Sequence, residues 1–429
     1  MELISAIATA KGRGGVAIVR MSGDNALEVA KKMFTKKGDW TPNMLYAGEI
    51  DGGAFRDFGM CVYFRAPKSF TGEDSVEFHC HGGNEIARGV LEKTYALGAR
   101  PARRGEFTKR AFLNGKLSLS AAEGMVDMIN AESEAEVRAG YTLYGEKLSN
   151  ESKKLASLLR TCLAEIDADL DYPEEDLEAA TGEETLRRLT EANAALDGLL
   201  KQYRAGKKLK SGVSVVLCGA PNAGKSTLFN ALLGYDRAIV SPVAGTTRDV
   251  VEGTVEINGV SFRISDTAGL HESGDSIERD GISRAEKAIK SADLILWLKE
   301  EADSPVEFPV GVPVLTVGAK SDIRAAAECD IAVSAHTGEG IDALRELIYE
   351  RGYGRENDGV YLLEERHYNA LLKAKKGVEQ AITTVEKGLP AELYAEDITL
   401  ALNALGELSG ESASETVINE IFEKFCVGK

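Results

Sequence analysis

The sequence predicts a multidomain protein: an α+β N-terminal domain, then an all-α helical domain into which an α/β nucleotide-binding domain is inserted. Three observations predict this fold class. Residues 1–116 mix strand-like runs with Gly-rich turns, the next stretch has helical periodicity, and residues after 212 alternate strand and helix. Helical periodicity returns after residue 357, so we expect the α/β segment to interrupt the helical domain.

Length and composition exclude several classes of protein. The chain has 429 residues, enough for roughly two to four domains, and 44% of them are hydrophobic. Its formal net charge of -17 would repel nucleic acid on average, so an RNA contact would need a local basic patch. The 6 cysteines form no C-x-x-C pair, and no run approaches the roughly 20 apolar residues of a membrane span. We therefore expect a cytoplasmic protein without a membrane anchor.

The first predicted domain, residues 1–116, contains strands and a helix. Residues 16–21, 58–64 and 75–81 are predicted strands, and residues 85–97 are a predicted helix. The helical domain is predicted over 117–209 and 357–429, where leucines recur at spacings near 3.6 residues.

The α/β domain, predicted over 210–356, begins with a phosphate-binding loop. Residues 219–226 read GAPNAGKS and match G-x-x-x-x-G-K-[ST], between an apolar strand and a predicted helix. Glycines let consecutive N–H groups point at phosphate oxygens, and the helix adds its positive end. Lys225 is expected to reach the β- and γ-phosphates, and Ser226 to hold Mg²⁺.

Three later elements favour GTP over ATP. Asp266-Thr-Ala-Gly269 matches the D-x-x-G segment that meets magnesium and the γ-phosphate, with Thr247 upstream completing the magnesium shell. Ala319-Lys-Ser-Asp322 stands where N-K-x-D reads guanine, and Ser334-Ala335 fits the last guanine loop. The residues predicted to bind GTP are Asn222, Ala223, Gly224, Lys225, Ser226, Thr227, Thr246, Thr247, Asp266, Thr267, Ala268, Gly269, Lys320, Asp322, Ser334 and Ala335.

Two positions depart from the usual GTPase pattern. Ala319 replaces the Asn that links the base to the phosphate loop, and losing such a hydrogen bond costs about 1 kcal/mol. Leu270 replaces the Gln that orients the attacking water in Ras-type switches. The acidic residues that follow could orient the water or simply solvate a helix start: Glu272, Asp275, Glu278 and Asp280. Asn222 could bind a monovalent cation or only shape the loop.

At this point the chain resembles the MnmE (TrmE) family of tRNA-modifying GTPases, from end to end. The resemblance rests on five blocks besides the GTPase elements: GRGGVAIVR at 12–20, SFTGED at 69–74, HGG at 81–83, RGEFTKRAFLNGK at 104–116, and the terminal CVGK at 426–429. Other GTPases lack these N-terminal blocks and this tail.

The resemblance implies a P-loop GTPase domain activated by potassium, in a homodimer whose N-terminal domains bind 5-formyl- or methylene-tetrahydrofolate. It implies that Glu278 orients the attacking water. The potassium ligands would be Asn222 and Thr246 with backbone groups near Ser241 and Val243, and the folate residues would be Arg20, Glu77, Lys116 and Lys429. With the FAD-dependent partner MnmG (GidA), the enzyme would modify C5 of the wobble uridine of certain tRNAs.

Some interpretations stay open at the sequence level. Cys426 is either a catalytic thiol or a tail residue near the folate site. His79 and His81 share a strand face, as folate-pocket or structural residues or, with less support, as metal ligands. The whole chain could instead be a ribosome-assembly GTPase switch of the Era or Der kind, which has no need for a folate site.

Overall fold

The computed structural model describes residues 1–171, 182–234, 251–266, 288–299, 308–323, 328–354, 361 and 364–429. Its contacts divide the chain into two compact units. The first holds residues 1–126, 143–189 and 376–429, and the second holds 127–142 and 190–375. The predicted three-domain boundaries are a finer division and stay a prediction. No helix among the described residues is long and apolar enough to cross a bilayer.

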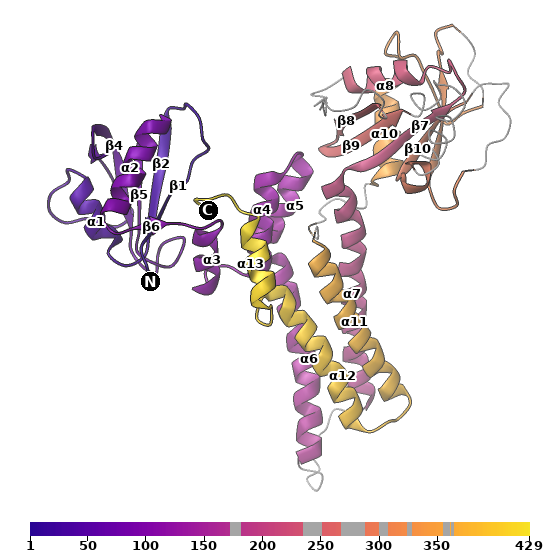
Figure 1. Cartoon of the computed structure of the whole chain (residues 1–429). Helices are drawn as coiled ribbons and strands as arrows, with labels where there is room; N and C mark the ends of the chain where they lie inside the picture. The colour runs from indigo at the N-terminus through magenta and orange to yellow at the C-terminus, as the bar shows by residue number, and fades with distance from the viewer. Residues whose placement is uncertain are drawn as a thin grey trace, which may run out of the picture. The chain divides into compact units, whose positions relative to one another are not determined.

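The N-terminal part of the first unit is one mixed sheet with two helices on one face (Figure 1). Its elements are β1 (Ile4–Ile7), β2 (Val16–Ser22), α1 (Ala26–Met33), β3 (Leu45–Asp51), β4 (Arg56–Phe64), β5 (Ser75–His81), α2 (Asn84–Ala96), β6 (Arg100–Pro101) and α3 (Glu106–Leu113). The strand order is β3-β4-β5-β2-β1-β6. The predicted strands at 16–21, 58–64 and 75–81 and the helix at 85–97 are confirmed to within a few residues.

Alternation along β5 gives this sheet two different faces. Val76, Phe78 and Cys80 are buried in the core beneath α1 and α2. The intervening residues Glu77 and His79 therefore point to the opposite face. That face is where the sheet can present polar side chains to a ligand.

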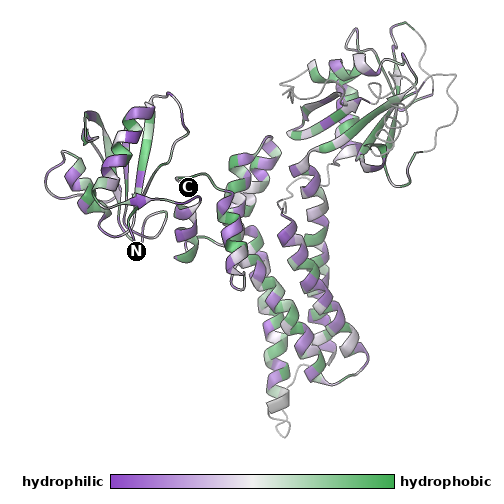
Figure 2. Cartoon of the chain, viewed as in Figure 1, coloured by the Kyte–Doolittle hydropathy of each residue, from purple (hydrophilic) through white to green (hydrophobic). Residues whose placement is uncertain are grey.

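The helices that follow pack mainly along their apolar stripes. They are α4 (Leu119–Asn130), α5 (Glu134–Tyr144), α6 (Lys147–Asp171), α7 (Gly182–Ser211), α11 (Glu365–Glu386), α12 (Ala391–Ser409) and α13 (Glu415–Glu423). Helices α6 and α12 lie side by side, and hydrophobic stripes run along both (Figure 2). Leu155 and Leu159 on α6 and Leu405 on α12 are buried, as the predicted 3.6-residue periodicity requires.

The second unit contains a six-stranded, mostly parallel sheet. Its elements are β7 (Val213–Gly219), α8 (Lys225–Gly234), β8 (Val251–Ile257), β9 (Val260–Asp266), β10 (Leu294–Leu298), β11 (Val314–Ala319), β12 (Ile331–Val333) and α10 (Ile341–Gly352). The order is β12-β11-β10-β7-β9-β8, and only β8 is antiparallel to its neighbour.

Two sequence signals explain this topology. Strand β7 is buried along nearly its whole length, as a central parallel strand covered on both faces must be. An Asn-Gly pair is typical of a tight hairpin turn, and Asn258 and Gly259 both have positive φ at the β8–β9 turn. Because β7 is central, the loop that follows it opens at the carboxyl edge of the sheet, where ligands of α/β domains bind.

Candidate functional site

The phosphate-binding loop is shaped by three residues with left-handed backbone: Gly219, Asn222 and Gly224, with φ of 150°, 65° and 103°. A side chain at Gly219 would also meet the Leu298 carbonyl oxygen at 2.7 Å, so the loop and the end of β10 fit only around glycine. Asn222 takes a conformation that asparagine tolerates better than most residues. This agrees with a loop-shaping role and leaves its side chain available to a ligand.

Lys225 lies almost fully buried at the start of α8 and folds over the loop. Its Nζ donates hydrogen bonds to the carbonyl oxygens of Gly219 (2.9 Å) and Ala220 (2.8 Å). An ammonium held at this point faces the space that the loop encloses. It is therefore positioned to neutralise phosphate charge, as the motif predicts.

Among the described residues, the two side chains predicted to hold magnesium, Ser226 and Asp266, are in direct contact. Ser226 Oγ donates a hydrogen bond to Asp266 Oδ2 at 2.9 Å, although the residues come from α8 and the end of β9. Oxygen atoms this close are the hard ligands that Mg²⁺ prefers. The donor set fits magnesium, which Ser226 is predicted to hold directly and Asp266 through water.

A lysine side chain, Lys320, joins the predicted guanine loop to the phosphate loop. Lys320 Nζ donates to the Asn222 carbonyl oxygen at 2.7 Å. Ala319 is buried, and its side chain carries no polar group that could link a base to the phosphate loop as the usual Asn does. Asp322 is exposed and can accept from a base, and Ser334 is buried in the last loop with its N–H bonded to the Glu339 carbonyl.

Several predicted residues of this site lie outside the described residues. These are Ser241, Val243, Thr246, Thr247, Thr267, Ala268, Gly269 and Glu278. All the potassium ligands, Asn222 included, and the water-orienting glutamate therefore stay predictions.

A second cluster forms on the open face of the N-terminal sheet. Arg20 on β2 stands directly across from Glu77 on β5, and Arg20 Nε donates to Glu77 Oε1 at 2.7 Å. Arg20 Nη1 also donates to the Gly428 carbonyl at 3.4 Å, 408 positions away in sequence. The structure thus brings together Arg20, Glu77 and the residue beside Lys429. Lys116 has a different neighbour, since its Nζ donates to the Pro67 carbonyl at 3.0 Å.

The C-terminal tail is fixed against the N-terminal domain by its backbone. Val427 forms a bridge with Arg104, and Cys426 accepts a hydrogen bond from the Gly105 N–H at 3.5 Å. Gly428 is buried with φ of 99°, and a Cβ there would meet the Ile7 carbonyl oxygen at 2.3 Å. Only glycine fits this position, so Gly428 allows the tail backbone to lie directly against the backbone of Ile7. The Cys426 residue itself is exposed.

Histidine 79 is a residue of this cluster whose role the sequence left open. Its Nε2 lies 3.3 Å from Glu77 Oε2, while His81 Nδ1 pairs with Asp57 Oδ1 at 2.6 Å. No group of three or more His, Cys, Asp or Glu side chains capable of holding a metal occurs among the described residues. Each histidine is therefore paired with a carboxylate. For His79, the sequence signal was its two-residue spacing from Glu77 on one strand, which places both side chains on the same face.

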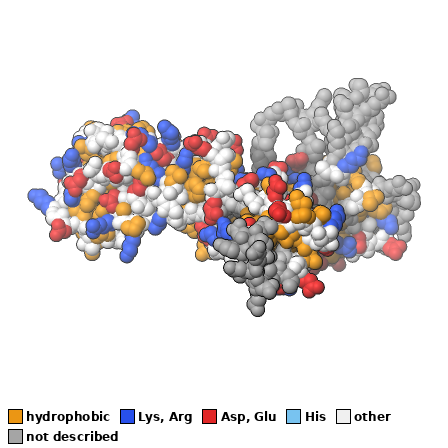
Figure 3. Space-filling view, turned by 90° about the horizontal axis from the view of Figure 1, so that it is seen from below, with side chains coloured by type: hydrophobic (Ala, Val, Ile, Leu, Met, Phe, Trp, Pro, Cys, Tyr) orange, Lys and Arg blue, Asp and Glu red, His pale blue; other side chains and the backbone are white. Residues whose placement is uncertain are grey.

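Two basic residues in the stretch around position 104, Arg100 and Arg110, are paired with carboxylates. Arg100 bonds Glu2 and Glu106, and the buried Arg110 bonds Glu73 and Glu106. On the face seen in Figure 3, blue and red side chains lie interspersed over the N-terminal part. These contacts favour a structural role for Arg100 and Arg110 over a phosphate-binding patch.

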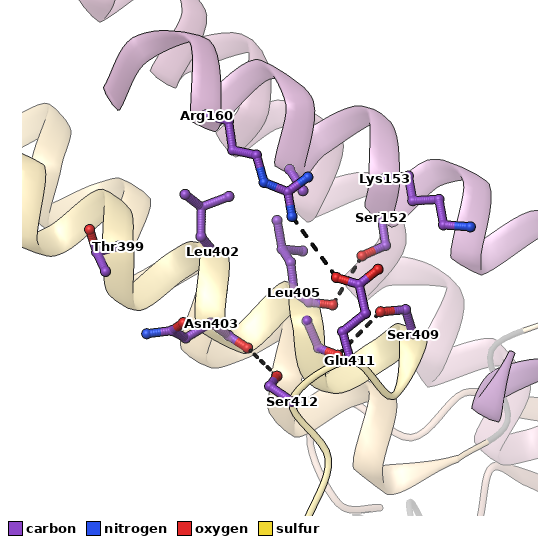
Figure 4. A pocket seen from close by; sticks show the side chains of 12 residues that line it. Ser152, Lys153, Arg160, Thr399, Leu402, Asn403, Leu405, Ser409, Glu411 and Ser412 are labelled. Carbon is purple, nitrogen blue, oxygen red and sulfur yellow. Dashed lines mark hydrogen bonds and ion pairs between the residues drawn. The ribbon is translucent and has the colours of Figure 1, made fainter. Parts of the chain in front are cut away.

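A cavity of about 270 Å³ lies between α6 and α12 in the first unit (Figure 4). Its polar groups bond one another: Ser152 donates to the Leu405 carbonyl at 3.2 Å, Ser412 donates to the Asn403 carbonyl at 3.1 Å, and Arg160 lies 3.9 Å from Glu411. Nothing in the sequence pointed to it, and its paired polar lining gives no reason to assign a ligand.

The phosphate loop, the Ser226–Asp266 pair and the strand order define the class of this protein as a P-loop GTPase with an additional N-terminal domain. Comparison with known proteins then gives the family. Residues 3–116 match the model of the GTP-binding protein TrmE N-terminus, and residues 119–426 match the MnmE helical domain.

Curated relatives match along the whole chain. A tRNA modification GTPase MnmE of Thermus thermophilus is 42% identical over 439 residues, covering 99% of each chain. That of a serogroup A strain of Neisseria meningitidis is 40% identical over 447 residues, covering 99% of this chain and 98% of that protein. The chain therefore belongs to the MnmE family, and the resemblance predicted from the sequence is confirmed. Among solved structures, the G domain of the Thermotoga maritima FeoB iron transporter is 28% identical over 32% of this chain and 98% of that one, with a TM-score of 0.24.

Proposed function

We propose that this chain is a potassium-activated tRNA modification GTPase that works with an FAD-dependent MnmG partner on C5 of the wobble uridine. Membership of the MnmE family along the full length carries the proposal, since the curated relatives are named for tRNA modification. The Arg20–Glu77 pair beside the C-terminal tail supports the folate part. A ribosome-assembly switch would have no use for that cluster.

In this proposal the chain hydrolyses GTP by positioning and charge stabilisation. Lys225 and the loop N–H groups hold the β- and γ-phosphates, while Ser226 and Thr247 hold Mg²⁺. Asn222 and Thr246, with backbone groups of Ser241 and Val243, hold K⁺, and Glu278 orients the attacking water. When bound by these residues, Mg²⁺ and K⁺ would neutralise the negative charge that develops in the transition state.

The second half of the proposal concerns the N-terminal domains of a homodimer. There Arg20, Glu77, Lys116 and Lys429 would hold 5-formyl- or methylene-tetrahydrofolate, and the chemistry that this group would supply is the one-carbon unit. Cys426 lies in the tail next to this site and serves either as a thiol catalyst or as part of its wall. GTP hydrolysis drives the conformational cycle that gates the modification.

The cation dependence of GTP hydrolysis tests the nucleotide half. We expect turnover to be at least about tenfold higher in KCl than in NaCl at equal ionic strength. Asn222→Ala should remove most of that difference, and Glu278→Ala should lower turnover with GTP affinity nearly intact. Equal wild-type rates in the two salts would contradict the potassium role.

A further inference from the structure

The open face of the N-terminal sheet carries a row of side chains set by strand register. On β5, Glu77 and His79 follow each other on this face, and Arg20 of β2 stands opposite Glu77. His79 stands between Ile18 of β2 and Met60 of β4, both half-buried. The histidine is thus fixed between two apolar neighbours, one strand repeat from the carboxylate.

The two oxygens of Glu77 are held by different donors. Arg20 Nε donates to Oε1 at 2.7 Å, and His79 Nε2 lies 3.3 Å from Oε2. An ionised carboxylate only accepts hydrogen bonds, so the histidine must carry a proton on Nε2. With one donor on each oxygen, the plane of the carboxylate is fixed, and each oxygen keeps a further lone pair for a ligand.

We propose that His79 is a positioning residue of this site, which holds Glu77 so that both carboxylate oxygens can accept from the adjacent ring N–H and amino group of a pterin. The proposal rests on the folate-binding function proposed above and deepens it. A carboxylate with a fixed plane makes two parallel hydrogen bonds to such a donor pair without losing rotational freedom on binding. His79 itself does not need to touch the ligand.

The charges around His79 agree with this role. Arg20 faces the cluster from β2, Asp57 of β4 is engaged by His81, and the guanidinium of Arg20 lies 5.7 Å from the centre of the Phe107 ring on α3. Burial opposes ionisation of Glu77, but the hydrogen bond from His79 and the charge of Arg20 outweigh it and lower the pKa of Glu77. Glu77 therefore stays an acceptor.

The test is equilibrium binding of 5-formyltetrahydrofolate to the full chain, measured by calorimetry for the wild type and His79 variants. We expect His79→Leu to weaken binding about tenfold, because Glu77 loses a donor to a charged group. His79→Gln, whose amide reaches the position of Nε2, should stay within about threefold of wild type. His81→Leu is the matched control on the same face and should bind like wild type.

A pH series separates positioning from a purely structural effect. Loss of the His79 bond raises the pKa of Glu77, so affinity should begin to fall at a higher pH in His79→Leu than in wild type as the solution is acidified. Should His79→Leu fail to fold, His79→Asn, whose amide stops short of Glu77, is expected to show the same loss. Wild-type affinity and an unshifted pH profile in these variants would overturn the proposal for His79 alone. No binding by the wild type would overturn the folate function itself.

Discussion

Burial raises the pKa of two carboxylates in this protein, the half-buried Glu77 and the buried Asp127, but the net pKa shifts of the two groups have opposite signs. Glu77, with 15% of its side chain exposed, meets two donors, and its pKa is lowered. Asp127 on α4, with 7% exposed, shares Lys210 with Glu364. Burial raises the pKa of Asp127 to about 7, Lys210 opposes the rise, and the second carboxylate adds to it. Burial raises both pKa values, so the direction of the net shift depends on whether the donors around each carboxylate outweigh it.

The opposite pKa shifts of Glu77 and Asp127 agree with the different positions of the two carboxylates in the fold. Glu77 stands on an open sheet face, where an ionised carboxylate can receive a ligand. Lys210 comes just before β7 and Glu364 just before α11, so the second cluster ties together the two chain crossings that flank the nucleotide-binding sheet. There one shared lysine holds elements in place, and Asp127 Oδ2 is buried without a hydrogen-bond partner.

Removing the shared lysine should have the largest effect. Lys210→Met leaves two carboxylates buried without their cation, and should lower the free energy of unfolding by about 2 kcal/mol at about pH 8, a value discounted because Lys210 is partly exposed. The loss should shrink near pH 5.5, where the carboxylates can take up protons. Urea unfolding at both pH values measures it. Lys207→Met, exposed on the same helix, is the control; an equal loss from both variants would contradict the account.

Glu106, which is paired with two arginines, should resemble Glu77 in having a lowered pKa. Glu106 lies between Arg100 and Arg110; burial opposes its ionisation, but the hydrogen bonds from Arg100, the Arg103 N–H and Arg110 prevail and lower its pKa to about 2. Because this pKa is depressed in the fold, its stabilisation is present above the unfolded value and is lost as pH falls towards 2. Glu106→Gln should cost about 1–2 kcal/mol near neutral pH. The difference from wild type in urea unfolding should vanish in acid, and a constant difference would argue against this pairing.

Replacing Asp127, whose Oδ2 has no hydrogen-bond partner, should have the smallest effect on stability. Unlike the loss of Lys210, this replacement should favour the folded state as pH rises. The pKa of Asp127 is raised in the fold, so its contribution is most favourable below the unfolded pKa and is lost as pH rises through about 7. Asp127→Asn should therefore lose less stability than wild type between about pH 5 and pH 8, by about 1 kcal/mol. Thermal unfolding of both proteins at the two pH values measures this. Parallel pH profiles would show that Asp127 does not titrate in this range.

Much of the fold followed from patterns that local physics controls. Alternation identified β2 and β5, a continuous apolar run identified β7, and the Asn258–Gly259 pair identified the β8–β9 turn. The short strands β1 and β6 were missed because four and two residues carry too little pattern, and their pairing depends on distant partners.

The two candidate sites also differ in how far they could be predicted from local sequence. The phosphate loop is a local motif, so its shape could be predicted from eight consecutive residues. The contact of Arg20 with Gly428 spans nearly the whole chain. Only the family resemblance predicted that Arg20 and the neighbouring Lys429 belong to one site. The Lys320 bond to Asn222 could not be predicted, because nothing in the sequence says which carbonyl a long lysine side chain reaches.

Whether GTP hydrolysis by this chain serves tRNA modification is tested most directly by wobble-uridine analysis of tRNA from cells that lack the chain. We expect the C5 modification to disappear from those tRNAs, to return with the wild-type chain, and not to return with Lys225→Ala. Unchanged wobble uridines in the deleted cells would contradict the account.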